Sequence, residues 1–122
     1  MSLPKGFDLY QWNTGCGAEK TNDLWRRAMA LNLRESRRFE IHCWKEEAAE
    51  LRAALAFGRE KETDWQWGRV VEGPVTPEFA RWLLELPKPA DTEVYNKMTP
   101  FFSIFLDNGF YSSHYGTELG ET

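Results

Sequence analysis

The stretch that decides the fold reads FFSIFLDNGFYSSHYGTE (residues 101–118). Two aromatic-rich segments, 101–107 and 110–115, flank the dipeptide Asn108-Gly109. An Asn-Gly pair favours a type I′ hairpin turn, because both of its residues readily adopt positive φ. The first segment is apolar on both faces apart from Ser103, which is typical of a strand that is covered on both sides. We therefore predict a C-terminal β-hairpin that turns at Asn108-Gly109.

Strands and helices are predicted to alternate upstream of this hairpin. Alternating apolar residues indicate strands at 7–12, 38–44 and 65–73, and helical spacing with capping signals indicates helices at 22–36, 45–58 and 77–86. Such alternation can build a parallel doubly wound sheet, but no glycine-rich phosphate loop follows a strand and a hairpin closes the chain. We expect one α+β domain over residues 1–122. Its mixed or mainly antiparallel sheet should have about five strands, with three helices packed mostly on one face.

The composition is that of an aromatic-rich, acidic globular domain. The chain has 122 residues, 15% aromatic residues and six Trp, more than a small core usually holds. Its net charge of −4 makes a nucleic-acid partner unlikely, because phosphate contacts need clustered Lys and Arg. Cys16 and Cys43 do not make a disulfide framework, and we find neither a signal peptide nor an apolar run that could span a bilayer. We expect a soluble, cytoplasmic protein without membrane contact.

The predicted strand over residues 38–44 sorts its side chains onto two faces. Cys43 falls on the apolar face, whereas Glu40 and His42 share the other. Because neighbouring side chains in a strand point to opposite faces, His42 and Cys43 cannot bind one ion. We therefore assign no metal site and no cofactor.

Both histidines of the chain are candidate general bases, since imidazole titrates near neutral pH. Either His42 or His114 could act in a small hydrolase or transferase, with Glu40 or Asp107 as the orienting carboxylate. No motif in the chain dictates a reaction class. The catalytic candidates His42, His114 and Glu40 therefore belong to an alternative hypothesis.

Aromatic side chains support the leading hypothesis. Trp65, Trp67 and Arg69 share one face of their predicted strand, and Trp44 and Tyr115 are candidates to lie nearby. Aromatic residues and Arg are enriched at protein interfaces and also line ligand pockets. These residues predict a non-catalytic module that binds a protein partner or a small molecule and that self-associates as a homo-oligomer, for instance a homodimer.

A third hypothesis rests on the region Arg26–Arg38, which contains five Arg. Such a region could meet phosphate or an acidic partner. Asp23, Glu35 and Glu40 partly neutralise it, as is common around a solvated helix. The corresponding function would be an anion-binding or nucleic-acid-associated module.

Overall fold

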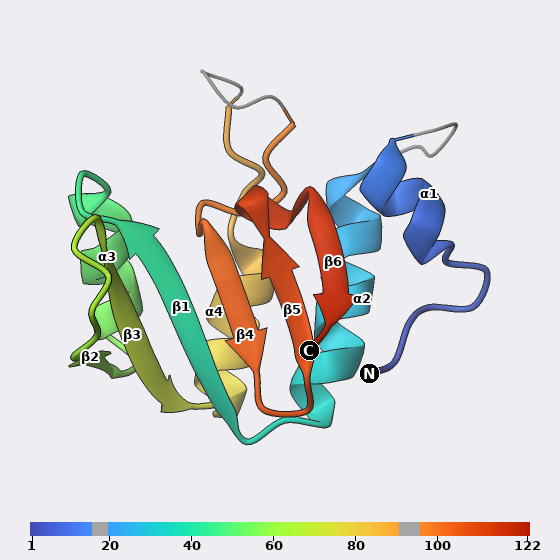
Figure 1. Ribbon diagram of the computed structural model, residues 1–122. Helices are drawn as coiled ribbons and strands as arrows, with labels where there is room; N and C mark the ends of the chain where they lie inside the picture. Colours follow the sequence, from blue (N-terminus) through green and yellow to red (C-terminus); the bar gives the residue numbers. More distant parts are fainter. Residues whose placement is uncertain (16–19, 91–95) are drawn as a thin grey trace.

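One antiparallel sheet of six strands organises the described part of the chain, residues 1–15, 20–90 and 96–122 of the computed structural model (Figure 1). The strands lie in the order β2-β3-β1-β4-β5-β6. They are β1 (Arg38–Trp44), β2 (Arg59–Lys61), β3 (Gly68–Pro74), β4 (Ser103–Leu106), β5 (Phe110–Ser113) and β6 (Glu118–Glu121). The helices are α1 (Leu9–Thr14), α2 (Asn22–Arg34), α3 (Ala48–Leu55), α4 (Pro77–Glu85) and the short turn η1 (His114–Gly116). The predicted α+β class and antiparallel sheet are confirmed.

Helices α2, α3 and α4 lie on one face of the sheet, and α1 packs against the edge strand β6 (Figure 1). The core fills the space between the helices and the sheet, where the rings of Phe39 and Phe79 stack with centroids 3.9 Å apart. No helix in the described ranges lies over the opposite face (Figure 1). None of them is long and apolar enough to cross a membrane. The side chains that point away from the helices therefore form an open surface.

Residues 7–12, predicted as a strand, belong instead to the segment that forms α1. Asp8 is the N-cap of this helix, and its carboxylate accepts a hydrogen bond from the N–H of Gln11 at 3.0 Å. The helix ends at Gly15, whose φ is +71°. The prediction was wrong because six residues of alternating polarity do not distinguish a strand from a short helix, whereas the Asp8–Gln11 spacing is an N-terminal capping signal.

The other helices were placed correctly, although their ends differ. Asn22 is a favourable N-cap residue in the sequence, but the N-cap of α2 is Thr21, whose hydroxyl accepts a hydrogen bond from the N–H of Leu24 at 3.1 Å. Thr76 caps α4 in the same way, followed by Pro77 at the first helical position as predicted. The helix predicted over 45–58 is shorter, at Ala48–Leu55.

Strands β3, β2 and β6 differ from the prediction. Strand β3 begins at Gly68, so that Trp65 and Trp67 precede it and are not alternate residues of one strand. The charged segment after α3, where no strand was predicted, contains the short edge strand β2. The final residues add β6, which was not predicted. Both additional strands are too short to show a reliable period in sequence.

The hairpin turns at Asn108-Gly109, but the turn is not of type I′. Only Gly109 of the pair has positive φ, at +97°, and its N–H donates to the carbonyl of Leu106 at 3.0 Å. The register pairs Phe105 with Tyr111, which leaves a three-residue loop. This arrangement is the common type I turn followed by a glycine bulge. The side-chain oxygen of Asn108 accepts from the N–H of Phe110, which explains why Asn suits the loop.

The strand after the hairpin turn is shorter than predicted. It ends at Ser113, and the next three residues, His114, Tyr115 and Gly116, have φ of 49°, 59° and 87°. A Cβ at Gly116 would lie 2.7 Å from the side chains of Met98 and Trp25, so this position requires glycine. The left-handed turn returns the chain as β6 beside β5.

Candidate functional site

The open face of the sheet carries a connected series of aromatic rings. Along β1 the side chains of Glu40, His42 and Trp44 point to this face and are half-buried, whereas Cys43 lies in the core. The alternation predicted for residues 38–44 is thus confirmed. The rings of the open face, which we call the aromatic face, belong to His42, Trp44, Trp65, Phe102, Phe105, Tyr111, His114 and Tyr115.

Each ring of the aromatic face contacts at least one other. From Tyr111 the series passes to Phe105 at 6.0 Å between centroids, and from Phe105 to His42 at 4.8 Å. His42 leads to Trp65 at 5.8 Å, and Trp65 to Trp44 at 5.1 Å. At the far end, Phe102 lies 4.8 Å from Trp44, 5.4 Å from His114 and 5.5 Å from Tyr115. The series therefore joins β5, β4 and β1 to the segments at one end of these strands.

Two glycines allow rings to lie flat on the sheet. A Cβ at Gly68 would overlap the six-membered ring of Trp65, and a Cβ at Gly120 would overlap the phenol of Tyr111. Gly68 is also the cross-strand partner of Trp44. Because each glycine lacks a side chain, a ring from a neighbouring segment can lie on its backbone. The ring supplies the packing that glycine itself does not provide in a strand.

Glu40 and His42 form the predicted carboxylate–imidazole pair, with His42 Nε2 at 3.1 Å from Glu40 Oε1. The second oxygen of Glu40 accepts from Lys61 Nζ at 3.0 Å. Partial burial opposes ionisation of Glu40, but hydrogen bonds from Lys61 and His42 outweigh it and lower the pKa of this carboxyl. The hydrogen bond to Glu40 also raises the pKa of Lys61. The carboxylate of Glu40 therefore orients the side chains of Lys61 and His42.

A nucleophile for this pair is not in place. Ser103 is the cross-strand partner of His42, yet within the described residues no hydrogen bond joins the two side chains. Cys43 is fully buried on the other face, and burial together with Glu47 and Glu50 raises the pKa of its thiol to about 12. A thiol of this kind stays protonated and unreactive at neutral pH.

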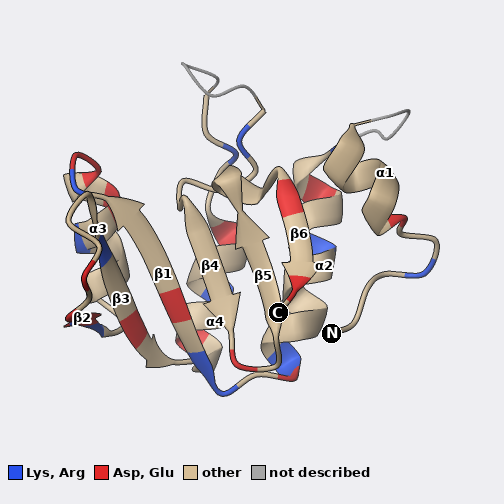
Figure 2. Cartoon of the chain, viewed as in Figure 1, with Lys and Arg blue, Asp and Glu red and all other residues tan. Residues whose placement is uncertain are grey.

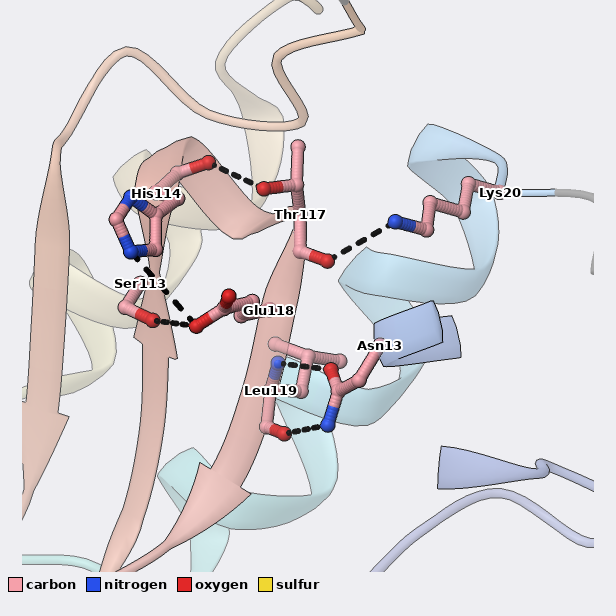
Figure 3. A network of polar contacts seen from close by, with 7 residues as sticks. All are labelled: Asn13, Lys20, Ser113, His114, Thr117, Glu118 and Leu119. Atoms are coloured by element: carbon pink, nitrogen blue, oxygen red, sulfur yellow. Dashed lines mark hydrogen bonds and ion pairs between the residues drawn. The ribbon is translucent and has the colours of Figure 1, made fainter. Parts of the chain in front are cut away.

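His114 has a different carboxylate from the one expected. Its Nε2 lies 3.8 Å from Glu118 Oε2, which also accepts a hydrogen bond from Ser113 Oγ at 3.3 Å (Figure 3). The carboxylate lies between the hydroxyl and the imidazole, whereas a relay needs the imidazole in the middle. Asp107 is engaged elsewhere, accepting from the N–H of Arg37 at 2.8 Å. The structure thus brings His42 together with Glu40 but does not bring His114 together with Asp107.

Tyr115 anchors one border of the aromatic face. Its hydroxyl donates to Glu47 Oε2 at 2.9 Å, and Lys97 Nζ lies 4.0 Å from its ring centroid. Burial, followed by the hydrogen bond to Glu47 and the charge of that carboxylate, raises the pKa of the phenol. The other oxygen of Glu47 accepts from the N–H of Trp44 at 2.8 Å. Glu47 therefore fixes Tyr115 and Trp44 relative to each other.

Trp67 and Arg69 lie outside this series of rings. Trp67 is 55% exposed, and Lys45 Nζ lies 4.8 Å from its ring. Arg69 Nε is 3.6 Å from Glu60 Oε1, at a hollow of about 190 Å³ that Trp65 also lines. This volume is below the range of about 300–1,000 Å³ that drug-sized ligands occupy. The sequence-based grouping therefore holds for Trp44, Trp65 and Tyr115 only.

Three rings of the aromatic face were absent from the sequence-based candidates: Phe102, Phe105 and Tyr111. Their place on this face follows only from the pairing of β4 with β1 and β5, because residues 101–107 are apolar on both faces and the sequence does not distinguish the two. Among the described residues, no group of three His, Cys, Asp or Glu side chains is arranged to hold a metal ion. Cys16 lies outside the described residues.

The five Arg of the third hypothesis do not converge on one site. Arg26 donates to the carbonyl of Leu86 at 2.6 Å, and Arg38 lines a shallow hollow beside Gly58. Arg27 and Arg34 line a different hollow, beside the N-terminal segment. A single phosphate could not meet all of them.

Comparison with protein-family models, with curated proteins and with solved structures finds no match. The function is therefore inferred from the geometry of the sites themselves.

Proposed function

We propose that the protein is a non-catalytic binding module and that its aromatic face binds a second copy of the chain. The observation that carries the proposal is the connected series of half-buried rings on a sheet face over which no described helix lies. Contiguous aromatic surface of this kind marks interaction sites, because its burial is favourable and rigid rings lose little entropy. A protein partner suits this broad series of rings better than a small ligand.

The charges around the rings favour self-association. Figure 2 shows acidic positions on β3, β1 and β6 and none on β4 or β5. Lys61 stands on the β2 side of the rings, and Glu118 stands on the β6 side. In a two-fold contact the same patch meets itself, so an axis near β4 places Lys61 of one copy over Glu118 of the other.

Binding is favoured over catalysis by the state of the Glu40–His42 pair. Both oxygens of Glu40 are occupied, and His42 is packed between the rings of Trp65 and Phe105. In the described residues the pair has no nucleophile in hydrogen-bonding position. In this proposal the Glu40–His42 pair fixes the orientation of the neighbouring rings within the interface.

Analytical ultracentrifugation over a concentration series tests the proposal. The unchanged protein should sediment as a dimer in reversible equilibrium with monomer. Phe105→Glu places a charge in the middle of the rings and should weaken the dimer about 30-fold or more, since a central hot spot contributes about 2 kcal/mol or more. Tyr10→Glu is the matched control, because Tyr10 is 75% exposed on α1, outside the aromatic face.

The control should dimerise like the unchanged protein, and both variants should keep its circular dichroism spectrum. A protein that stays monomeric at millimolar concentration would refute self-association. A dimer that survives Phe105→Glu would place the interface elsewhere.

A further inference from the structure

Two hollows open on the helix-covered side of the molecule, and both are lined by Ala30 and Arg34 of α2. One holds about 500 Å³ and is bounded by the N-terminal segment at Leu3 and Pro4. The other holds about 400 Å³ and is bounded by Val75 and by α4. Both volumes lie in the range of about 300–1,000 Å³ that small-molecule sites occupy. We call the two hollows together the α2 groove.

The α2 groove combines apolar side chains with three cations, of which Arg34 borders both hollows and Arg27 and Lys5 border one. Arg27, Ala30, Leu31 and Arg34 follow one another at helical spacing and form a stripe along α2. Seven residues of helix separate the two Arg by about 10 Å along the axis. Lys5 adds a third cation on the N-terminal segment. Ser36 and Thr76 add hydroxyl groups, and the remaining lining is aliphatic, with no aromatic ring to stack on a nucleobase.

The three cations are available to a ligand. Arg27, Arg34 and Lys5 are exposed, and within the described ranges no hydrogen bond or ion pair engages their side chains. The nearest acidic residue in sequence, Glu35, is turned to Ser2 and Asn108. Its hydrogen bond from Ser2 lowers the pKa of this carboxyl despite some desolvation. Among the residues that the structure describes, no ion pair therefore neutralises these three cations.

We propose that the α2 groove binds a free aliphatic carboxylate, with its hydrocarbon chain against Ala30 and Leu31 and its carboxylate on Arg34, Arg27 or Lys5. The aliphatic lining complements a hydrocarbon chain, whose burial is favourable in proportion to the area removed from water. The guanidinium group complements a carboxylate, because its parallel N–H groups match the two oxygens. This site is separate from the aromatic face and does not depend on the function proposed for it.

Decanoate is the probe for this site, used below the concentration at which it forms micelles. Titration of ¹⁵N-labelled protein should shift the amide signals of Leu3, Lys5 and residues 27–34 in a saturable way. Acetate carries the charge without the chain, and decyltrimethylammonium carries the chain with the opposite charge. Neither should bind measurably. Equal binding of decyltrimethylammonium would overturn the proposal, as would shifts confined to β1, β4 and β5.

Two variants separate the charge from the apolar walls. Arg27→Gln/Arg34→Gln should weaken decanoate binding about tenfold or more, because charge-assisted hydrogen bonds are lost. Arg52→Gln/Arg59→Gln removes the same charge at the opposite end of the molecule and should leave affinity unchanged (Figure 1). Ala30→Phe fills the wall that both hollows share and should abolish binding while all cations remain.

Thermal unfolding of each variant shows whether it is folded at the temperature of the titration. Unchanged affinity in the Arg27→Gln/Arg34→Gln variant would overturn the proposal. Vesicles of phosphatidylglycerol distinguish a free ligand from a membrane surface. Binding to these vesicles without binding to monomeric decanoate would overturn the assignment of a free carboxylate and indicate a lipid surface.

Discussion

The side chain of Asn13 binds both backbone groups of Leu119. Its Nδ2 donates to the Leu119 carbonyl at 2.8 Å, and its Oδ1 accepts from the Leu119 N–H at 2.9 Å (Figure 3). Leu119 lies on β6, the last strand of the sheet, so Asn13 occupies hydrogen-bonding positions that another strand would use. Lys20 Nζ and Trp12 Nε1 donate to the carbonyls of Thr117 and Gly116 in the same way. The N-terminal segment thus closes this sheet edge against further strands.

Asn13→Ala should destabilise the protein by about 1–2 kcal/mol, because two hydrogen bonds to the edge strand are lost. Urea denaturation followed by Trp fluorescence measures the change. Gln11→Ala is the control, since Gln11 is an exposed residue of the same short helix. Hydrogen exchange at the Leu119 amide should accelerate in Asn13→Ala alone. Equal stability of the two variants would show that Asn13 does not hold the edge.

Gly68→Ala should destabilise the protein by about 1–3 kcal/mol, because the added methyl group displaces the ring of Trp65. A double-mutant cycle with Trp65→Ala isolates this cause. The cost of the alanine should fall below about 1 kcal/mol once the indole is absent. A cost that does not change in the Trp65→Ala background would attribute the effect of Gly68→Ala to the backbone rather than to the ring.

Glu40 should make stability depend on pH in the acidic range. The folded state lowers the pKa of Glu40, so in the unfolded chain this carboxyl binds its proton at a higher pH. Its contribution is present above the unfolded pKa and is lost as the pH falls through the folded pKa. The difference in unfolding free energy between the unchanged protein and Glu40→Gln should therefore shrink on acidification from pH 6 to about 3. A difference that stays constant over this range would contradict the shift.

Cys43 should resist alkylation in the folded protein. Burial and the nearby carboxylates of Glu47 and Glu50 raise the pKa of its thiol to about 12, which leaves about one thiolate in ten thousand at pH 8. A Cys16→Ser background limits the reaction with iodoacetamide to Cys43. Mass spectrometry should find no adduct in native buffer and one adduct in urea. Rapid labelling in native buffer would show that β1 opens locally.

The sequence was most informative where a pattern was long or a cap was specific. Seven alternating residues located β1 to the residue, and Thr76-Pro77 located the start of α4. The strand predicted over residues 7–12 was wrong. These residues belong to the segment that forms α1, which buries Trp12, and the indole N–H of Trp12 donates to a carbonyl distant in sequence, that of Gly116. The edge strands β2 and β6 depend on neighbours that only the fold supplies.

The candidate site was predictable only in part for the same reason. Alternation placed Glu40, His42 and Trp44 on one face without knowledge of the fold. The partner of His114 could not be found from the strand pattern, because the left-handed turn at 114–116 redirects the imidazole towards Glu118. The contact of Trp65 with this face depends on Gly68, which sequence alone marks only as a residue of a strand.

The left-handed turn also limits the stability of the folded chain. A residue other than glycine in this conformation costs about 1–2 kcal/mol, and His114 and Tyr115 both adopt it. His114 is exposed, so a single change to glycine would relieve part of this cost without emptying the core. Such a glycine would also remove the imidazole, and with it the contacts of residue 114 with Phe102 and Glu118.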